Sequence, residues 1–178
     1  MKTMRNVMRA GWLVGLLAML VPMTARAQHY RLERVNDTLS VLLLETRDAK
    51  GKVVQTDRWR ITYPVYQWCE GDVDGDGMAE ALVGVIKATR FSPEKDRRLF
   101  VFHNVKGHIR PLWMGTRLGG RLVDFRFVNG HLRSLEMSKD GCRFAVGEYT
   151  WSRFGPAFKE YLILNSTKHE SMEVFQGK

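Results

Sequence analysis

From residue 28 onward, the sequence alternates between short runs rich in β-branched and aromatic residues and turns of glycine, asparagine and aspartate. The clearest case is the pair of runs 122–128 and 131–137, which flank Asn129-Gly130. Asn-Gly favours a type I′ turn, because both of its central residues adopt positive φ. The first run alternates apolar and charged residues, as expected for a strand with one buried face. This segment therefore predicts a β-hairpin.

The same pattern extends along most of the chain and predicts an all-β fold with about ten to twelve strands in an antiparallel meander. No segment after residue 28 has a convincing helical period. Trp59, Trp113 and Trp151 lie near the ends of successive groups of strands, which indicates a weak repeat of about 40 to 50 residues. The other predicted strands cover residues 38–46, 53–62, 65–68, 81–88, 99–105, 109–114, 144–151 and 158–164.

Residues 1–27 have the features of a signal peptide. A basic start precedes the apolar run 11–21, which is short for a membrane span, and Ala25-Arg26-Ala27 follows as a small-x-small cleavage pattern. The alternative is an uncleaved membrane anchor. We expect a single all-β domain at 28–164 and a polar tail at 165–178, in which residues 172–175 could add an edge strand.

Removing residues 1–27, which hold four basic residues and no acids, lowers the formal net charge from +9 to +5. A moderate positive charge favours loose attraction to acidic glycans or lipids, and no motif for nucleic acid is present. The two cysteines, Cys69 and Cys142, could form one disulfide in an exported protein or remain as two thiols. The spacing leaves both options open.

Residues 71–85, GDVDGDGMAEALVGV, concentrate acids in a chain that is otherwise basic. Counting Asp72 as position one, carboxylates also occupy positions three and five (Asp74 and Asp76) and position nine (Glu80). A loop that turns every second side chain inward can supply the six to eight oxygens that Ca²⁺ prefers. We therefore predict a calcium site whose ligands are Asp72, Asp74, Asp76, the backbone carbonyl of Met78, and Glu80.

An EF-hand is excluded, because it needs a Glu at position twelve, where this chain has Val83, and a helix on each side. Zinc is disfavoured because the loop holds no His or Cys, and Mg²⁺ because it requires strict octahedral geometry. An acidic turn without metal is the remaining alternative. Four closely spaced carboxylates would then repel one another with no cation to offset the repulsion.

The loop resembles the D-x-[DN]-x-D-G-x-x-[DE] element of FG-GAP and VCBS-type repeats, the calcium loops of integrin α-subunit β-propellers. Asp72, Asp74, Asp76 and Glu80 match its acidic positions, and residues 81–85 match the strand that follows it. The resemblance implies bound Ca²⁺ and partial β-propeller-like blades, with a β-sandwich as the alternative fold. It covers one loop, and residues 153–158, RFGPAF, contain only a fragment of the Phe-Gly…Gly-Ala-Pro stretch.

These features favour an exported, calcium-binding, structural or ligand-binding module of the periplasm or cell surface. Its partner would be a glycan or a cell-surface protein, and it could form a homo-oligomer that closes an incomplete set of blades. The alternative is an extracytoplasmic hydrolase that acts on glycans, with a structural calcium. No residue is assigned a catalytic role, although Asp124 and Glu136 could meet across the Asn-Gly hairpin. A second candidate surface combines one aromatic residue with arginines: Trp113, Arg110, Arg117, Arg121, Arg126 and Arg133.

Overall fold

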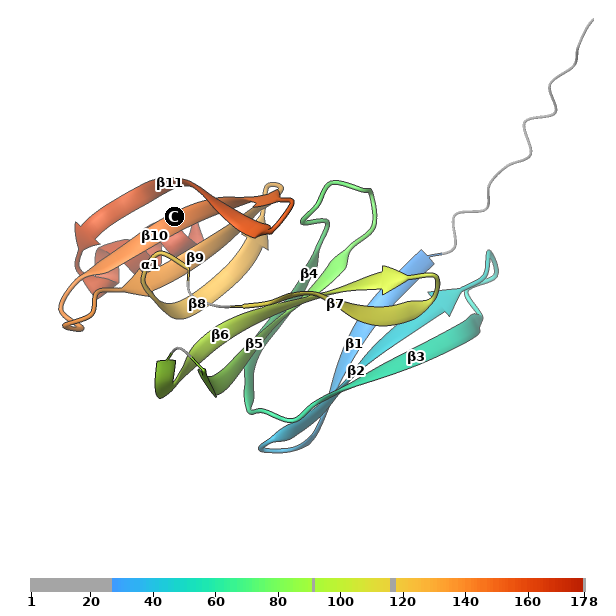
Figure 1. Cartoon of the computed structure of the whole chain (residues 1–178). Coiled ribbons are helices and arrows are strands. Elements are labelled where there is room, and N and C mark those ends of the chain that lie inside the picture. The colour runs from blue at the N-terminus through green and yellow to red at the C-terminus, as the bar shows by residue number, and fades with distance from the viewer. Residues whose placement is uncertain (1–26, 91, 116–117, 178) are drawn as a thin grey trace, which may run out of the picture.

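Three antiparallel sheets follow one another along the chain in the computed structural model, which describes residues 27–90, 92–115 and 118–177 (Figure 1). The first sheet contains β1 (Ala27–Asn36), β2 (Leu39–Arg47) and β3 (Val53–Ile61). The second contains β4 (Val65–Gly71), β5 (Glu80–Thr89), β6 (Ser92–Val105) and β7 (His108–Met114). The third contains β8 (Arg121–Val128), β9 (His131–Met137), β10 (Phe144–Ser152) and β11 (Gly155–Ser166).

Within each sheet, every strand pairs with its neighbour in the sequence, so each sheet is a simple meander. The all-β, antiparallel fold class is confirmed. The expected signal peptide lies outside the described residues, apart from Ala27, with which β1 begins. In the described ranges, no helix has both the length and the apolar character that a membrane span requires.

The three sheets stack face to face, with the β4–β7 sheet in the middle. One hydrophobic cluster joins the first sheet to the second and includes Tyr30, Leu42 and Phe100. Another joins the second sheet to the third and includes Leu82 and Phe125. The middle sheet is thus covered on both faces (Figure 1).

This double burial explains the composition of β5. Its residues 80–85 are all buried, Val83 against the first sheet and Leu82 against the third. A strand buried on both faces shows a continuous apolar run instead of alternation. The run ALVGVI at 81–86 is therefore the expected sequence for a central strand.

The Asn-Gly hairpin is confirmed. Val128 pairs with His131, which leaves Asn129 and Gly130 as the two-residue loop between β8 and β9. Their φ angles of 51° and 77° are both positive, as a type I′ turn requires. The sequence alone placed this turn because its geometry depends on two adjacent residues.

Strand β1 was not predicted, because the sequence pattern indicates no strand before residue 38. The strand is rich in charged residues, and Arg31 forms an ion pair with Glu45 of β2 at 3.4 Å. Its buried contribution is Tyr30, which is packed into the first hydrophobic cluster. Leu32 is partly buried against the same cluster, so the strand holds only two residues that pack there, and the periodic signal is weak.

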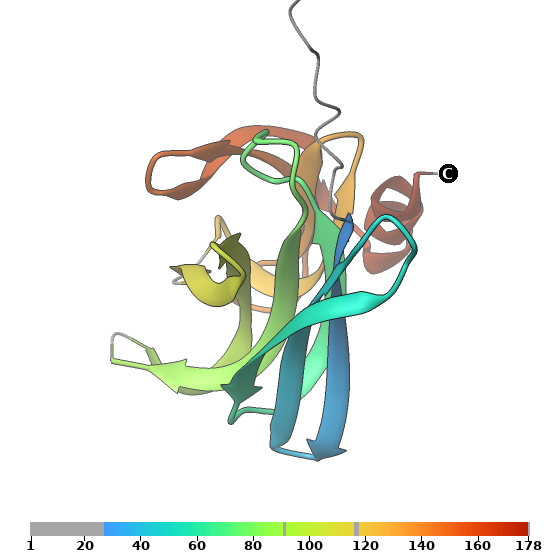
Figure 2. The same cartoon turned by 90° about the vertical axis from the view of Figure 1, so that its right-hand side faces the viewer.

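The prediction of an edge strand in a polar tail was wrong, because residues 168–176 form the helix α1 (Lys168–Gln176). Thr167 and Glu170 form a capping box at its start, and Gly177 ends it with a φ of 79°. Phe175 packs on Leu135 and Val146, on the face of the third sheet that points away from the second. Figure 2 shows the helix on the outside of the stacked sheets.

Two arginines from the third sheet hold the end of this helix. Arg126 donates to the Phe175 carbonyl at 3.1 Å, and Arg133 donates to the Val174 carbonyl at 3.3 Å. Cations at a helix C-terminus satisfy its free carbonyls and oppose the negative end of its dipole. A nine-residue helix is marginal in isolation, so these tertiary contacts decide its formation.

Candidate metal centre

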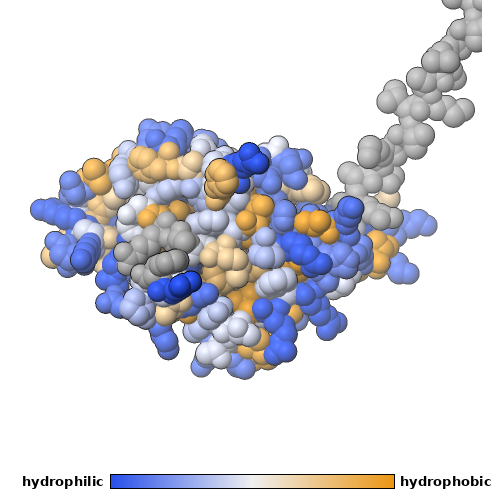
Figure 3. All heavy atoms as spheres, viewed as in Figure 1, coloured by the Kyte–Doolittle hydropathy of each residue, from blue (hydrophilic) through white to orange (hydrophobic). Residues whose placement is uncertain are grey.

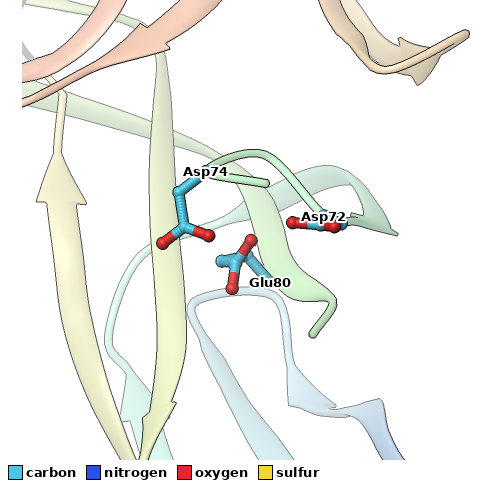
Figure 4. A group of neighbouring side chains, drawn as sticks. All are labelled: Asp72, Asp74 and Glu80. Atoms are coloured by element: carbon cyan, nitrogen blue, oxygen red, sulfur yellow. The ribbon is translucent and has the colours of Figure 1, made fainter. Parts of the chain in front are cut away.

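The acidic residues lie in the loop that joins β4 to β5, at one end of the middle sheet. Gly71 pairs with Glu80 at the base of this loop. Asp72, Asp74 and Glu80 each offer one carboxylate oxygen to a group in which all three oxygens lie within 4.8 Å of one another. Figure 4 shows the three side chains converging on a common space. Two oxygens bound to one Ca²⁺ at 2.3–2.6 Å can be at most about 5 Å apart, so this spacing fits a shared ion.

Backbone amides hold the loop in this curled form. The Asp72 carboxylate accepts hydrogen bonds from the amides of Gly75 at 2.8 Å and Gly77 at 3.0 Å. Both glycines have positive φ, 78° and 86°, which residues with a side chain rarely adopt. The glycines therefore allow the chain to turn twice within a few residues and bring Asp74 back towards Glu80.

Glu80 differs from the other acids because it is the first residue of a buried strand. It is only 1% exposed, and its Oε2 accepts a hydrogen bond from the Val73 amide at 2.9 Å. Burial, together with the negative charges of Asp74, Asp76 and Asp72, raises the pKa of the Glu80 carboxyl to about 7. A cation in the loop would offset both effects.

Strand β1 supports the base of the loop. The sequence did not predict this contact. The Gln28 side chain donates to the carbonyl of Ala79 at 3.3 Å, and the Tyr30 amide donates to the Glu70 carboxylate at 2.5 Å. Burial and the nearby charge of Glu80 raise the pKa of Tyr30. These contacts depend on the pairing of β1 with the rest of the fold, so no local motif could have indicated them.

Two of the predicted ligands lie outside the converging group. Asp76 accepts a hydrogen bond from the Met78 amide at 2.7 Å and does not belong to the three-carboxylate set. The Met78 side chain is partly exposed. The structure therefore brings together Asp72, Asp74 and Glu80 as a group that could hold a metal ion, and Asp76 and the Met78 carbonyl remain predictions.

The raised pKa of Glu80 predicts how pH acts on the metal-free protein. The folded state holds a proton up to about pH 7, whereas an unfolded chain releases it near the ordinary value of 4.5. The protonated Glu80 carboxyl therefore contributes fully to the free energy of unfolding below about pH 4.5, and this contribution is lost as the pH rises to about 7. We expect Glu80→Gln to raise the melting temperature at pH 8 in chelator and to have little effect at pH 4.5.

The control for this experiment is Glu94→Gln, which changes an exposed glutamate with no ion pair among the described residues. It should leave the melting temperature unchanged at both pH values. Equal melting temperatures for Glu80→Gln and the unmodified protein at pH 8 would contradict the account of Glu80.

The arginines considered as a binding surface are engaged in separate structural contacts. Arg121 forms an ion pair with Asp96 at 3.4 Å, and Arg133 forms one with Glu148 at 2.7 Å. Trp113 packs into the cluster between the second and third sheets. Arg117 lies outside the described residues. Most residues of the predicted arginine-rich surface therefore form ion pairs, pack between the sheets or bind the end of helix α1.

The other candidate pairs are also separated. Asp124 lies opposite Leu135, and Glu136 lies opposite Leu122, so the two acids are not cross-strand partners. Both cysteines are free thiols in the structure. Cys69 packs against the second cluster, and burial raises its pKa to about 11, whereas Cys142 is exposed in the turn before β10.

The sequence matches no protein-family model, and no curated protein matches it. The resemblance of the β4–β5 loop to FG-GAP and VCBS-type repeats stays a prediction from the sequence.

Proposed function

We propose that this chain is an exported, calcium-binding, all-β module in which the ion fixes the β4–β5 loop for a structural or ligand-binding role. The observation that carries the proposal is the convergence of Asp72, Asp74 and Glu80. Their carboxylate oxygens lie within 4.8 Å of one another at the end of a sheet that is buried on both faces.

The donor set favours calcium over other common ions. All three side chains offer hard carboxylate oxygens, which suit Ca²⁺ and not the His and Cys sites typical of zinc. Calcium tolerates irregular geometry and accepts water and backbone carbonyls in addition to carboxylates. The Asp76 side chain, the Met78 carbonyl and water would complete the six to eight ligands.

The position of the loop explains what the ion would do. Glu80 begins β5, the strand that contacts both hydrophobic clusters, and Asp72 follows β4 directly. A cation would cancel the repulsion among the acids and fasten these two strands together at their ends. The module would then present a rigid loop surface for adhesion to a glycan or a cell-surface protein.

Strand β11 supports a role in contacts with another macromolecule. It forms one edge of the third sheet, and Phe158, Leu162 and Leu164 on it are exposed. In the space-filling view, hydrophobic residues interrupt the hydrophilic surface along the upper side, where β11 lies (Figure 3). An exposed edge with apolar side chains is a common site of strand pairing with a second chain.

Isothermal titration of the metal-free protein with CaCl₂ tests the proposal. We expect saturation at one site, with an affinity reduced about tenfold or more by Asp74→Asn, because the substitution removes a charge from the converging group. Asp37→Asn changes an exposed aspartate in the β1–β2 turn and should bind calcium as the unmodified protein does.

Absence of saturable heat at millimolar calcium would overturn the proposal, and so would equal affinities for Asp74→Asn and Asp37→Asn. A glycan panel then separates the two roles considered for the module. Retention of a glycan without product release supports a binding module, whereas release of shorter products supports a hydrolase.

A further inference from the structure

The third sheet contains a buried carboxylate that has no cationic partner in the part of the chain that the structure describes. Glu136 of β9 is 2% exposed, and no Lys, Arg or His among the described residues lies within ion-pair distance of it. Buried charges in proteins are normally paired, because an isolated charge loses its hydration without compensation. Glu136 belongs to the third sheet, whereas the acidic loop joins two strands of the second sheet, so Glu136 has no part in that loop.

Three donors from the protein orient this carboxylate. The Ser134 hydroxyl and the Tyr149 hydroxyl both donate to Oε1, each at 2.6 Å, and the Gly120 amide donates to Oε2. Tyr149 is fixed in turn by the Gly119 amide, which donates to its oxygen at 2.9 Å. Since each carboxylate oxygen accepts about two hydrogen bonds, Oε1 is fully used and Oε2 retains one free acceptor position.

The Gly119-Gly120 pair makes this arrangement sterically feasible. A Cβ on Gly119 would lie 3.0 Å from Oε2 of Glu136 and 2.8 Å from the Tyr161 hydroxyl oxygen. A Cβ on Gly120 would lie 3.1 Å from the same Oε2. The absence of side chains thus leaves a space beside the carboxylate that any other residue would fill.

A cavity of about 110 Å³ opens at this point. Its polar wall includes Glu136 and Tyr161, and its apolar wall includes Phe144, Ala145 and Leu164. Arg143 also lines the cavity, and its guanidinium donates to the Asn165 carbonyl at 3.5 Å. The cavity therefore combines the buried carboxylate of Glu136, the guanidinium of Arg143, hydroxyl groups and a short apolar surface.

We propose that this cavity binds the primary ammonium group of a small organic monoamine, with Glu136 as its counter-charge. An ammonium group has three donors, and it finds acceptors in Oε2 of Glu136 and in the Tyr161 oxygen. A short alkyl chain packs on the apolar wall, and the volume limits the ligand to a few heavy atoms. The positive charge of Arg143 opposes a second ammonium group and so selects a monoamine over a diamine.

The proposal can be tested on the protein by NMR titration with propylammonium chloride, followed through the amide signals of Gly119 and Gly120. We expect saturable shifts of both signals with propylammonium and none with 1-propanol, which has the same size without the charge. Glu136→Gln should weaken the apparent affinity about tenfold or more, since a charge-assisted contact is lost. Glu160→Gln changes an exposed glutamate on β11 and should leave binding unchanged.

A second variant covers the case in which Glu136→Gln fails to fold, because its side chain accepts three hydrogen bonds. Leu164 is 54% exposed and lines the cavity, so Leu164→Trp should fold normally and obstruct the space. We expect it to reduce binding about tenfold or more. Shifts of equal size with 1-propanol, no saturable shifts with propylammonium, or unchanged binding in Leu164→Trp would each overturn the proposal.

Discussion

Calcium at one hundred times its dissociation constant is expected to stabilise this protein by about 2.7 kcal/mol, because the ion binds the folded loop and not the unfolded chain. For a chain of this size, that corresponds to a rise in melting temperature of roughly 5–10 °C. The gain would come from neutralising Asp72, Asp74 and Glu80, whose oxygens converge within 4.8 Å. Thermal unfolding followed by circular dichroism, with and without calcium, measures it.

Chelator should return the melting temperature to its metal-free value. Asp74→Asn should show a smaller calcium-induced rise, whereas Asp37→Asn should show the full one. Magnesium at the same concentration should produce a smaller shift, because it demands a closer and more regular set of ligands. Identical melting curves in calcium and in chelator would contradict the prediction that the loop binds calcium.

Phe125→Ala is expected to destabilise the protein by about 3–5 kcal/mol, the cost typical of deleting a fully buried aromatic ring. Phe125 is completely buried between the second and third sheets and meets the Tyr66 ring edge-on at 6.2 Å between ring centroids. Since these two sheets contact each other mainly through this cluster, the cavity left behind would weaken their packing. We expect a fall in melting temperature of roughly 10 °C.

Phe154→Ala is the matched control, because Phe154 is 86% exposed in the turn between β10 and β11. It should change the free energy of unfolding by no more than about 0.5 kcal/mol in urea denaturation. If Phe125→Ala cost less than about 1 kcal/mol, the interface between the second and third sheets would not be the cooperative core described above.

The acidic loop and the cluster around Phe125 are connected through β5. Glu80 begins β5, and Leu82, two residues later, packs in the cluster that contains Phe125. Occupation of the loop should therefore protect the backbone amides of β4 and β5 more than those of the first sheet. The ion would therefore stabilise the middle sheet more strongly than the rest of the protein.

The weak repeat of about 40 to 50 residues can be compared with the lengths of the three sheets. The second and third sheets, residues 65–114 and 121–166, have lengths in the range suggested by Trp59, Trp113 and Trp151, whereas the first sheet, residues 27–61, is shorter. The tryptophans lie in β3, β7 and β10, and Trp113 and Trp151 both border the cluster between the second and third sheets. The repeat thus reflects the succession of meanders, each of which needs large side chains to fill the space against its neighbour.

Features that depend on neighbouring residues could be read directly from the chain. The turn at Asn129-Gly130 follows from two adjacent φ preferences. Alternate spacing in a glycine-containing loop indicated a group of acids that includes Asp72, Asp74 and Glu80, but it did not show that Asp76 lies outside this group. The continuous apolar run of β5 likewise indicated a strand. In each case the physical cause operates over fewer than about ten residues, which is the range over which sequence patterns are informative.

Features built from distant segments required the folded chain. The helix α1 forms because Phe175 finds Leu135 and Val146, and because Arg126 and Arg133 cap its end from other strands. The space around Glu136 arises where Gly119, Tyr149 and Tyr161 meet. No local sequence motif predicts this arrangement. Local backbone preferences and charge spacing could thus be predicted from the sequence. Burial was decided only when the sheets packed together, because packing determines which groups surround each buried side chain.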